Sequence, residues 1–224
     1  MNPQSAKKRL AVFFTLISVP IALTIYSRTT SAIAHHHLGG MPHHQQSPTH
    51  NSHHEMSMTL GPADGEYDLR FIDSMILHHQ GAVNMAEVVL QNSQRPEMKK
   101  LAQAIIEAQE QEIAQMKAWR KSWYAKASDQ PLMWHTKMNH STAMNPEQTQ
   151  AMMMHMDLGK GDTEFDLRFI DAMIPHHEGA LVMAKDALSK SQRAEIQELS
   201  QAILASQQQE IEQMKQWRKD WYQR

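Results

Sequence analysis

The chain has 224 residues, with 22 Lys and Arg against 24 Asp and Glu, and no basic patch of the kind that binds nucleic acid. Cysteine is absent, which excludes disulfides and cysteine-attached haem. Methionine and histidine are abundant instead, at 18 and 15 residues, more than an ordinary core requires.

The first 34 residues have the organisation of a removable export signal. Basic residues 7–9 precede an apolar run over residues 10–25, and Ala32-Ile33-Ala34 fits a cleavage site. Because this run is shorter than the ~20 residues of a membrane span, we expect cleavage after Ala34 and no span in the mature chain; a retained anchor is the alternative. The mature protein would carry 18 basic against 24 acidic residues and would lie in the periplasm or outside the cell.

Residues 35–62 combine histidine and methionine with Gly, Pro, Ser and Gln, a composition that predicts disorder. If cleavage follows Ala34, the mature chain begins with three histidines. A free terminal amine followed by a histidine at the third position can hold Cu(II) in a square plane of nitrogens.

An internal duplication dominates residues 63–224, which we expect to form a single bundle. Residues 66–124 and 164–222 align without a gap at an offset of 98, with about 36 of the 59 positions identical. Each copy predicts a helical hairpin, over 66–125 and 164–223, joined by a Met- and His-rich linker over 126–163. Nowhere is there sustained alternation of apolar and polar residues, so we expect no sheet.

The first helix of each hairpin carries two adjacent apolar stripes at helical spacing, and each stripe contains one histidine. In the first copy the stripes are Phe71, Met75, His78, Ala82, Met85, Val89 and Ile72, Ile76, His79, Val83, Ala86, Leu90. His176 and His177 occupy the same places in the second copy. Both histidine pairs are therefore expected in the buried sector.

The second helices should begin near Pro96 and its counterpart, because proline suits a first helical turn. The residues expected on one face of each helix are Leu101, Ile105, Ala108, Glu112, Met116, Trp119 and Trp123 in the first and Ile203, Ser206, Glu210, Met214, Trp217 and Trp221 in the second. Two interpretations of Glu112 and Glu210 stay open: they orient histidines, or they lie at a partly exposed bundle end or form an intrahelical pair. Pro175 replaces Leu77 of the first copy and predicts a kink or local opening.

One hairpin cannot bury its own apolar face, but two hairpins can cover each other. The predicted fold is an all-α four-helix bundle with a pseudo-two-fold axis between the hairpins. The linker either crosses the bundle or returns along one end.

The histidine pairs and their neighbouring methionines predict a site for a soft metal ion. The candidate ligands are His78, His79, His176, His177, Met75, Met85, Met173 and Met183. Imidazole with thioether favours copper, with silver as its surrogate, and zinc would not explain the methionines. Adjacent histidines project about 100° apart on a helix, so either both converge on the bundle axis or each meets partners from other helices. The methionines are ligands or core filler.

The linker carries a second group of His and Met side chains beside Trp134: His135, Met138, His140, Met144 and residues 152–156. We expect weak additional copper sites there, with Cu(II) bound at the surface or on the N-terminal tail.

The pattern Asp-x-x-Phe-Ile-Asp-x-Met-Ile-x-His-His-x-x-Ala-x-x-Met-Ala covers residues 68–86 and 166–184. With the later Gln-x-Glu-Ile-x-Gln-Met, it resembles the domain-of-unknown-function family numbered three hundred and five. That resemblance implies an exported ferritin-like bundle that serves as a copper chaperone or in copper resistance. It implies metal binding most firmly for His78, His79, His176 and His177.

The sequence thus predicts an exported copper-binding protein that buffers or delivers copper, possible partners being a copper exporter or sensor. We do not expect an enzyme, because the Glu-x-x-His motif of di-iron bundles is missing from the chain. Two alternatives stay open: a helical adaptor for a protein partner, and sequestration of nickel or zinc.

Overall fold

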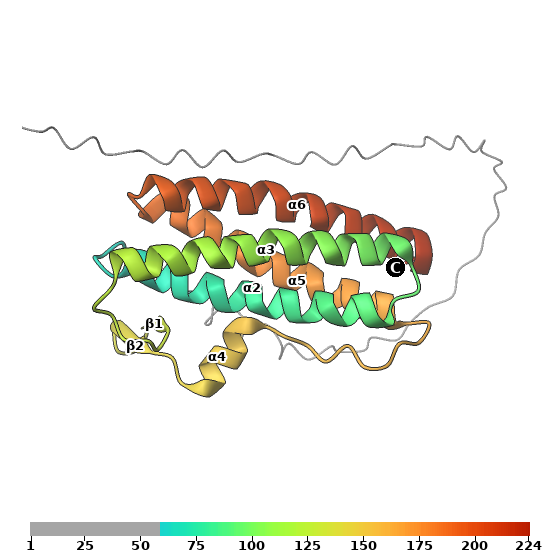
Figure 1. Ribbon diagram of the computed structural model, residues 1–224, viewed down its shortest axis with the longest axis horizontal. Coiled ribbons are helices and arrows are strands. Elements are labelled where there is room, and N and C mark those ends of the chain that lie inside the picture. The colour runs from blue at the N-terminus through green and yellow to red at the C-terminus, as the bar shows by residue number, and fades with distance from the viewer. Residues whose placement is uncertain (1–58) are drawn as a thin grey trace, which may run out of the picture. The chain divides into compact units, whose positions relative to one another are not determined.

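The computed structural model describes residues 59–224, which contain a bundle of four long helices (Figure 1). The predicted export signal and most of the predicted His-rich segment, both of which precede the bundle in the chain, lie outside the described residues. The helices are α2 (Tyr67–Asn92), α3 (Pro96–Trp123), α5 (Phe165–Lys190) and α6 (Ala194–Tyr222). The predicted all-α four-helix class is confirmed, and none of the described helices is long and apolar enough to cross a membrane.

The two hairpins pack through α2 and α5, which run antiparallel. Asp68 in the first turn of α2 pairs with Arg193 just before α6, at 3.2 Å. Asp166 and Arg95, the counterparts of Asp68 and Arg193 in the duplicated sequence, form the equivalent pair at 3.4 Å. Because each residue of one pair is related to its counterpart by the offset of 98, the two contacts are symmetric. The expected pseudo-two-fold axis therefore relates the hairpins.

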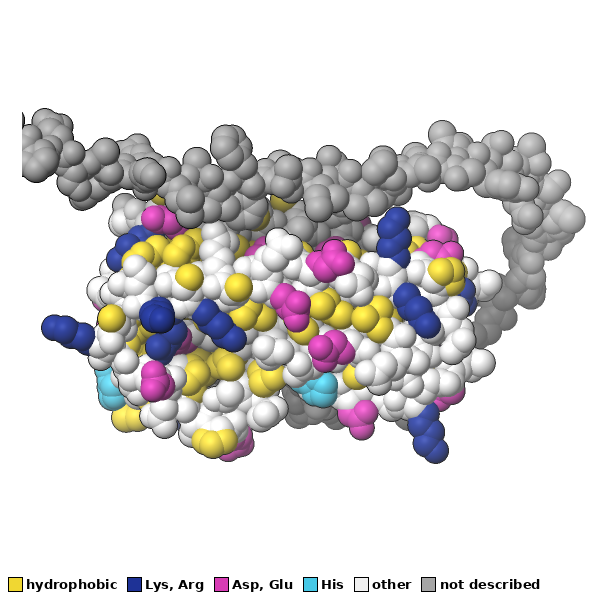
Figure 2. All heavy atoms as spheres, viewed as in Figure 1, with side chains coloured by type: hydrophobic (Ala, Val, Ile, Leu, Met, Phe, Trp, Pro, Cys, Tyr) yellow, Lys and Arg dark blue, Asp and Glu magenta, His cyan; other side chains and the backbone are white. Residues whose placement is uncertain are grey.

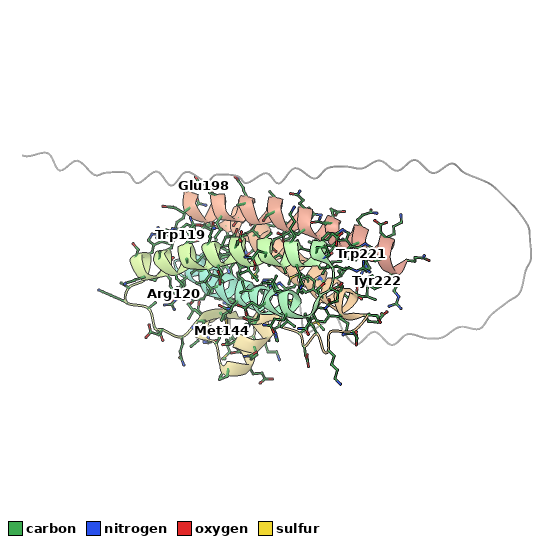
Figure 3. The ribbon with its side chains drawn as sticks, turned by 45° about the vertical axis from the view of Figure 1, so that its right-hand side comes forward. Trp119, Arg120, Met144, Glu198, Trp221 and Tyr222 are labelled. Carbon is green, nitrogen blue, oxygen red and sulfur yellow. The ribbon has the colours of Figure 1, made fainter. Side chains whose placement is uncertain are left out.

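The second helices of the hairpins, α3 and α6, end at opposite ends of the bundle. Figure 3 shows Trp119 and Arg120 toward one end and Trp221 and Tyr222 at the other. Figure 2 shows lysine, arginine and acidic side chains interspersed on the face that these two helices present, without an extended basic patch in that view.

The linker runs lengthwise along α2. It therefore crosses the bundle and does not return along one end, which were the two paths expected for it. It contains β1 (Leu132–His135), β2 (His140–Ala143) and α4 (Pro146–Met153). Ser141 of the hairpin accepts a hydrogen bond from Arg70 near the start of α2, at 2.8 Å. Farther along, α4 ends beside Gly81 in the middle of α2 (Figure 1). A single long crossover of this kind is found in ferritin-like bundles.

The expectation of no sheet was wrong for this linker. β1 and β2 form an antiparallel hairpin in which Leu132 pairs with Ala143 and His135 with His140. Each strand has only four residues, which is too short for apolar and polar alternation to show in the sequence. The hairpin depends on the bundle: the Arg70 guanidinium lies 5.1 Å from the Trp134 ring centre.

The predicted buried faces of α3 and α6 were wrong at one position each. Ala108 and Ser206 are exposed, whereas the following residues, Gln109 and Gln207, are each 3% exposed. Positions 108 and 109 both lie one helical turn after Ile105, so the spacing alone does not choose between them. The packing of the hairpins decides which of the two is buried.

The proline in the second copy does not open its helix. α5 continues from Phe165 to Lys190 through Pro175, so the expected local opening is not seen. The Pro175 side chain lies on the exposed side of α5, away from the neighbouring hairpin.

Candidate metal centre

His78 and His176 face each other at the centre of the bundle, where α2 crosses α5. Their ring centres are 3.8 Å apart and the ring planes are inclined by 46°. His78 is 0% and His176 1% exposed. Because the two residues are equivalent in the duplicated copies, the pair lies where the pseudo-two-fold axis passes between the hairpins.

These two rings have several nitrogens without a hydrogen-bond partner. Both nitrogens of His78 are unpartnered, as is Nδ1 of His176. His176 Nε2 lies 3.1 Å from the carbonyl oxygen of Met153. A carbonyl only accepts, so the neutral His176 ring donates through Nε2 and keeps a lone pair on Nδ1. The pair therefore presents unpartnered imidazole nitrogens in the buried interior of the bundle.

The neighbouring histidines have a different environment. His79 Nε2 lies 2.7 Å from Glu112 Oε2, and His177 Nε2 lies 2.6 Å from Glu210 Oε2. Each glutamate contacts a histidine, as the first interpretation expects, and its side chain is also partly exposed, at 15% for Glu112 and 18% for Glu210. In the neutral rings, donation from Nε2 leaves Nδ1 as the acceptor, and both Nδ1 atoms are buried and unpartnered.

Burial keeps the central pair neutral. It lowers the pKa of His78 well below its usual range, and the nearby His176 and His79 act in the same direction. Burial, with a smaller effect from His177, lowers the pKa of His176 to about 3, although the bond to Met153 opposes the change. A neutral imidazole has a lone pair to offer a metal, so the site needs no proton release near neutral pH.

The four candidate methionines are all fully buried. Met75 and Met183 belong to one apolar cluster, and Met85 and Met173 belong to the other. Met75 and Met173 each precede the histidine of the central pair by three residues, about 4.5 Å along the helix axis. Met85 and Met183 follow at seven residues, about 10 Å away. The nearer two are therefore better placed as ligands, while the farther two suit core packing.

The donor set is small. Within residues 59–224, no three His, Asp or Glu side chains are gathered in a group that could hold a metal ion. Zinc sites usually use four ligands, and Mg²⁺ and Ca²⁺ use six or more oxygens. A pair of buried imidazoles with thioethers one helical turn away suits a soft ion of low coordination number.

Two contributors to the site were missed from the sequence, Gly81 and the Met153 carbonyl. A Cβ added to Gly81 would lie 1.8 Å from the Met153 oxygen and 3.2 Å from His176 Nε2. Only glycine lets the end of α4 approach α2 and reach His176. Glycine is unfavourable inside a helix, so its position in the middle of a 26-residue helix was an available signal.

The linker donors divide between surface and core. His135 and His140 stack across the hairpin with ring centres 6.5 Å apart, and Met138 beside them is 56% exposed. In contrast, Met144 and Met152 are 4% and 2% exposed and pack on the bundle, and Met144 appears on the linker in Figure 3. The hairpin can offer a surface site, whereas the buried methionines serve first as packing.

Comparison with known proteins identifies the family to which the chain belongs. The model of a domain of unknown function, DUF305, matches residues 68–218. The chain belongs to the DUF305 family. No curated protein matches it.

Solved structures of other DUF305-like proteins agree with this assignment. Silver-soaked CopM is 37% identical with a TM-score of 0.55, and the match covers 69% of this chain and 97% of CopM. CopM in the apo form is 38% identical with a TM-score of 0.54, covering 69% and 98%. A DUF305 fragment from Deinococcus radiodurans is 28% identical with a TM-score of 0.53, covering 69% and 95%. CopM has also been solved in Cu(I)-bound and Cu(II)-bound forms. This DUF305 protein therefore resembles CopM over most of the latter's length.

Proposed function

We propose that this protein binds Cu(I) between His78 and His176 in the centre of the bundle. The observation that carries the proposal is the pair of buried imidazoles, whose ring centres are 3.8 Å apart and which have three unpartnered ring nitrogens, two of them with a lone pair when both rings are neutral. An unpartnered buried acceptor costs about 1–3 kcal/mol, and a bound cation removes that cost.

The chemistry of the surroundings favours copper over other metals. Cu(I) accepts two nitrogen donors with thioethers nearby. Met75 and Met173 carry such thioethers, each about one helical turn before the central histidine of its helix. The forms in which CopM has been solved, with Cu(I), Cu(II) and silver, support the same assignment by similarity. Silver then serves as a surrogate for Cu(I) in experiments.

We infer a role in buffering or delivering copper outside the cytoplasm, as part of copper resistance. The export signal and the His-rich segment before the bundle support this role from the sequence. Cu(II) would bind to surface or tail histidines, and a copper exporter or sensor would receive the ion.

The test is an anaerobic competition titration of Cu(I) against a chromophoric chelator. His78→Leu and His176→Leu should each weaken the tightest site by more than about tenfold, because even loss of an outer hydrogen bond to a ligand costs that much. His155→Leu, which changes an exposed linker histidine, is the matched control and should leave the tightest site intact. Unchanged Cu(I) affinity in both core variants would refute the proposal. Tight zinc or nickel binding with weak Cu(I) binding would favour sequestration of those metals instead.

A further inference from the structure

The end of α4 covers one edge of the central histidine pair. The Met153 carbonyl occupies the space that a side chain at position 81 of α2 would fill, and an added Cβ there would lie 3.2 Å from His176 Nε2. His176 reaches this point from α5 and donates to the same carbonyl at 3.1 Å. Met153 is only partly buried, whereas His176 is 1% exposed. One short segment therefore lies between this edge of the His176 ring and solvent.

Soft donor side chains gather at the same end of α4. Residues 152–156 read Met-Met-Met-His-Met, and their exposure rises along the segment. Met152 is 2% exposed, Met153 and Met154 are partly buried, and His155 and Met156 are exposed, Met156 by 54%. Packing explains Met152, but a methionine that is more than half exposed contributes little to a core. The five side chains form a series of donors that leads from solvent to the interior.

The series continues into the core. Met152 belongs to the apolar cluster that contains Met75, and Met154 packs against that cluster. Met75 lies about one helical turn before His78. The other cluster, which contains Met173, includes no linker methionine among the described residues. Thioethers thus extend from the surface to the level of His78 on the side of the bundle that α4 covers.

The chemistry of these side chains suits the passage of Cu(I). Thioethers are neutral ligands that prefer soft cations, and they lose no proton on binding. Donors that follow one another along the chain let the ion exchange one ligand for the next. Because only ligands are exchanged, copper keeps its oxidation state throughout.

We propose that the end of α4, residues 153–156, is the site at which Cu(I) enters and leaves the bundle. The exposed His155 and Met156 bind the ion first, and the partly buried Met154 and Met153 pass it inward. The inference rests on the proposed function, since the destination of the ion is the central histidine pair.

The last step requires a small movement of α4. When its end lifts, the hydrogen bond between His176 and the Met153 carbonyl breaks, and the space beside Gly81 opens. α4 has eight residues, and such short elements open locally at a lower free energy than the global unfolding of a protein. Return of the segment restores the hydrogen bond and encloses the ion.

Release of Cu(I) from the full chain loaded with one equivalent tests the proposal. An excess of a chromophoric chelator extracts the ion anaerobically, at concentrations where the rate no longer depends on the chelator. The triple variant Met153→Leu/Met154→Leu/Met156→Leu should release the ion at least tenfold more slowly, because leucine keeps the side-chain volume and removes the sulfur. Its equilibrium affinity for Cu(I) should stay within threefold of the wild type, so loading is slowed by a similar factor.

Met138→Leu is the matched control, because it removes an exposed thioether from the β-hairpin. It should release Cu(I) at the wild-type rate. Equal rates for the triple variant and Met138→Leu would overturn the entry site and leave the central site intact. A loss of equilibrium affinity beyond threefold in the triple variant would also overturn it, since the methionines would then be ligands of the tight site.

Methionine methyl spectra give an independent measurement of binding at the entry site. In a variant with both central histidines changed to leucine, excess Ag(I) should shift the ¹³C-methyl resonances of Met153, Met154 and Met156. The resonance of Met98, which is buried in the other cluster, should not shift. Unshifted resonances of all three linker methionines would overturn the entry site. Wild-type Cu(I) affinity in that double variant would refute the central site instead, and the entry role with it.

Discussion

Three of the four core imidazoles donate Nε2–H to an oxygen that can only accept. The acceptors are the Met153 carbonyl for His176, Glu112 for His79 and Glu210 for His177. The Met153 carbonyl fixes the tautomer of the neutral His176 ring, whose Nδ1 keeps its lone pair, while Glu112 and Glu210 hold Nε2 of His79 and of His177. At the scale of single residues, the oxygen partners therefore decide which nitrogen is free to bind a cation.

Glu112→Ala should destabilise the metal-free protein by about 1–3 kcal/mol, because it leaves a buried Nε2–H of His79 without an acceptor. The measurement is urea denaturation followed by circular dichroism. ¹⁵N spectra of the His79 ring should show a loss of the single Nε2–H tautomer in the variant.

The control for Glu112→Ala is Glu110→Ala, an exposed glutamate on the same helix whose removal should change stability by less than about 0.5 kcal/mol. Glu210→Ala should behave like Glu112→Ala, since the two pairs have the same geometry. Equal stability of Glu112→Ala and Glu110→Ala would show that the buried pair contributes nothing.

The burial of the individual histidines could be predicted from the sequence. The periodicity placed His78 and His79 on two buried stripes, and both are 0% exposed. It left open whether the adjacent histidines converge or meet partners from other helices. The structure selects the second, with His78 against His176 and His79 on Glu112. Neighbours on a helix point about 100° apart, so their partners depend on which helix faces each direction.

At the scale of elements, α4 and the β-hairpin distinguish the two copies. The linker lies along α2, so one copy is covered by a segment that the other lacks among the described residues. Ala108 and Gln109 illustrate a related limit of sequence reasoning. Their order of burial follows the orientation of α3 against its neighbours, which helical spacing alone does not fix.

Gly81→Ala should destabilise the protein by roughly 1–3 kcal/mol, because the added methyl group would force the end of α4 away from α2. Helix propensity alone predicts the opposite sign, a gain of about 1 kcal/mol. The measurement is urea denaturation, with hydrogen exchange of residues 146–156 reporting whether α4 is displaced.

Gly65→Ala is the matched control for Gly81→Ala, because an added Cβ there has no atom within 4 Å. It should change stability only slightly. A Gly81→Ala protein that is more stable than the wild type, with unchanged exchange in α4, would show that the close approach at Gly81 does not matter.

At the scale of the whole molecule, the central histidine pair exists only when the two hairpins are packed together. One histidine comes from α2 and the other from α5, 98 residues later. The symmetric ion pairs Arg95–Asp166 and Arg193–Asp68 join the hairpins at both ends. A cation held by both central histidines therefore binds the folded bundle and not the separated hairpins.

Silver should raise the unfolding temperature through this linkage. At a free Ag(I) concentration one hundred times the dissociation constant, binding stabilises the folded state by about 2.7 kcal/mol. For a bundle of this size, that corresponds to a rise of about 5–10 °C, measured by differential scanning calorimetry. The double variant His78→Leu/His176→Leu should show less than half of the rise, and an undiminished rise would place the stabilising ion elsewhere.

The sequence by itself determined the duplication, the helical hairpins and the burial of both histidine pairs, because helical periodicity is a local property of the chain. The tertiary structure decided that α2 and α5 run antiparallel, that His78 meets His176, and that the linker passes over Gly81. These features depend on contacts between residues far apart in the chain, whose free energies are summed over whole faces. That sum cannot be predicted from any single stretch of the sequence.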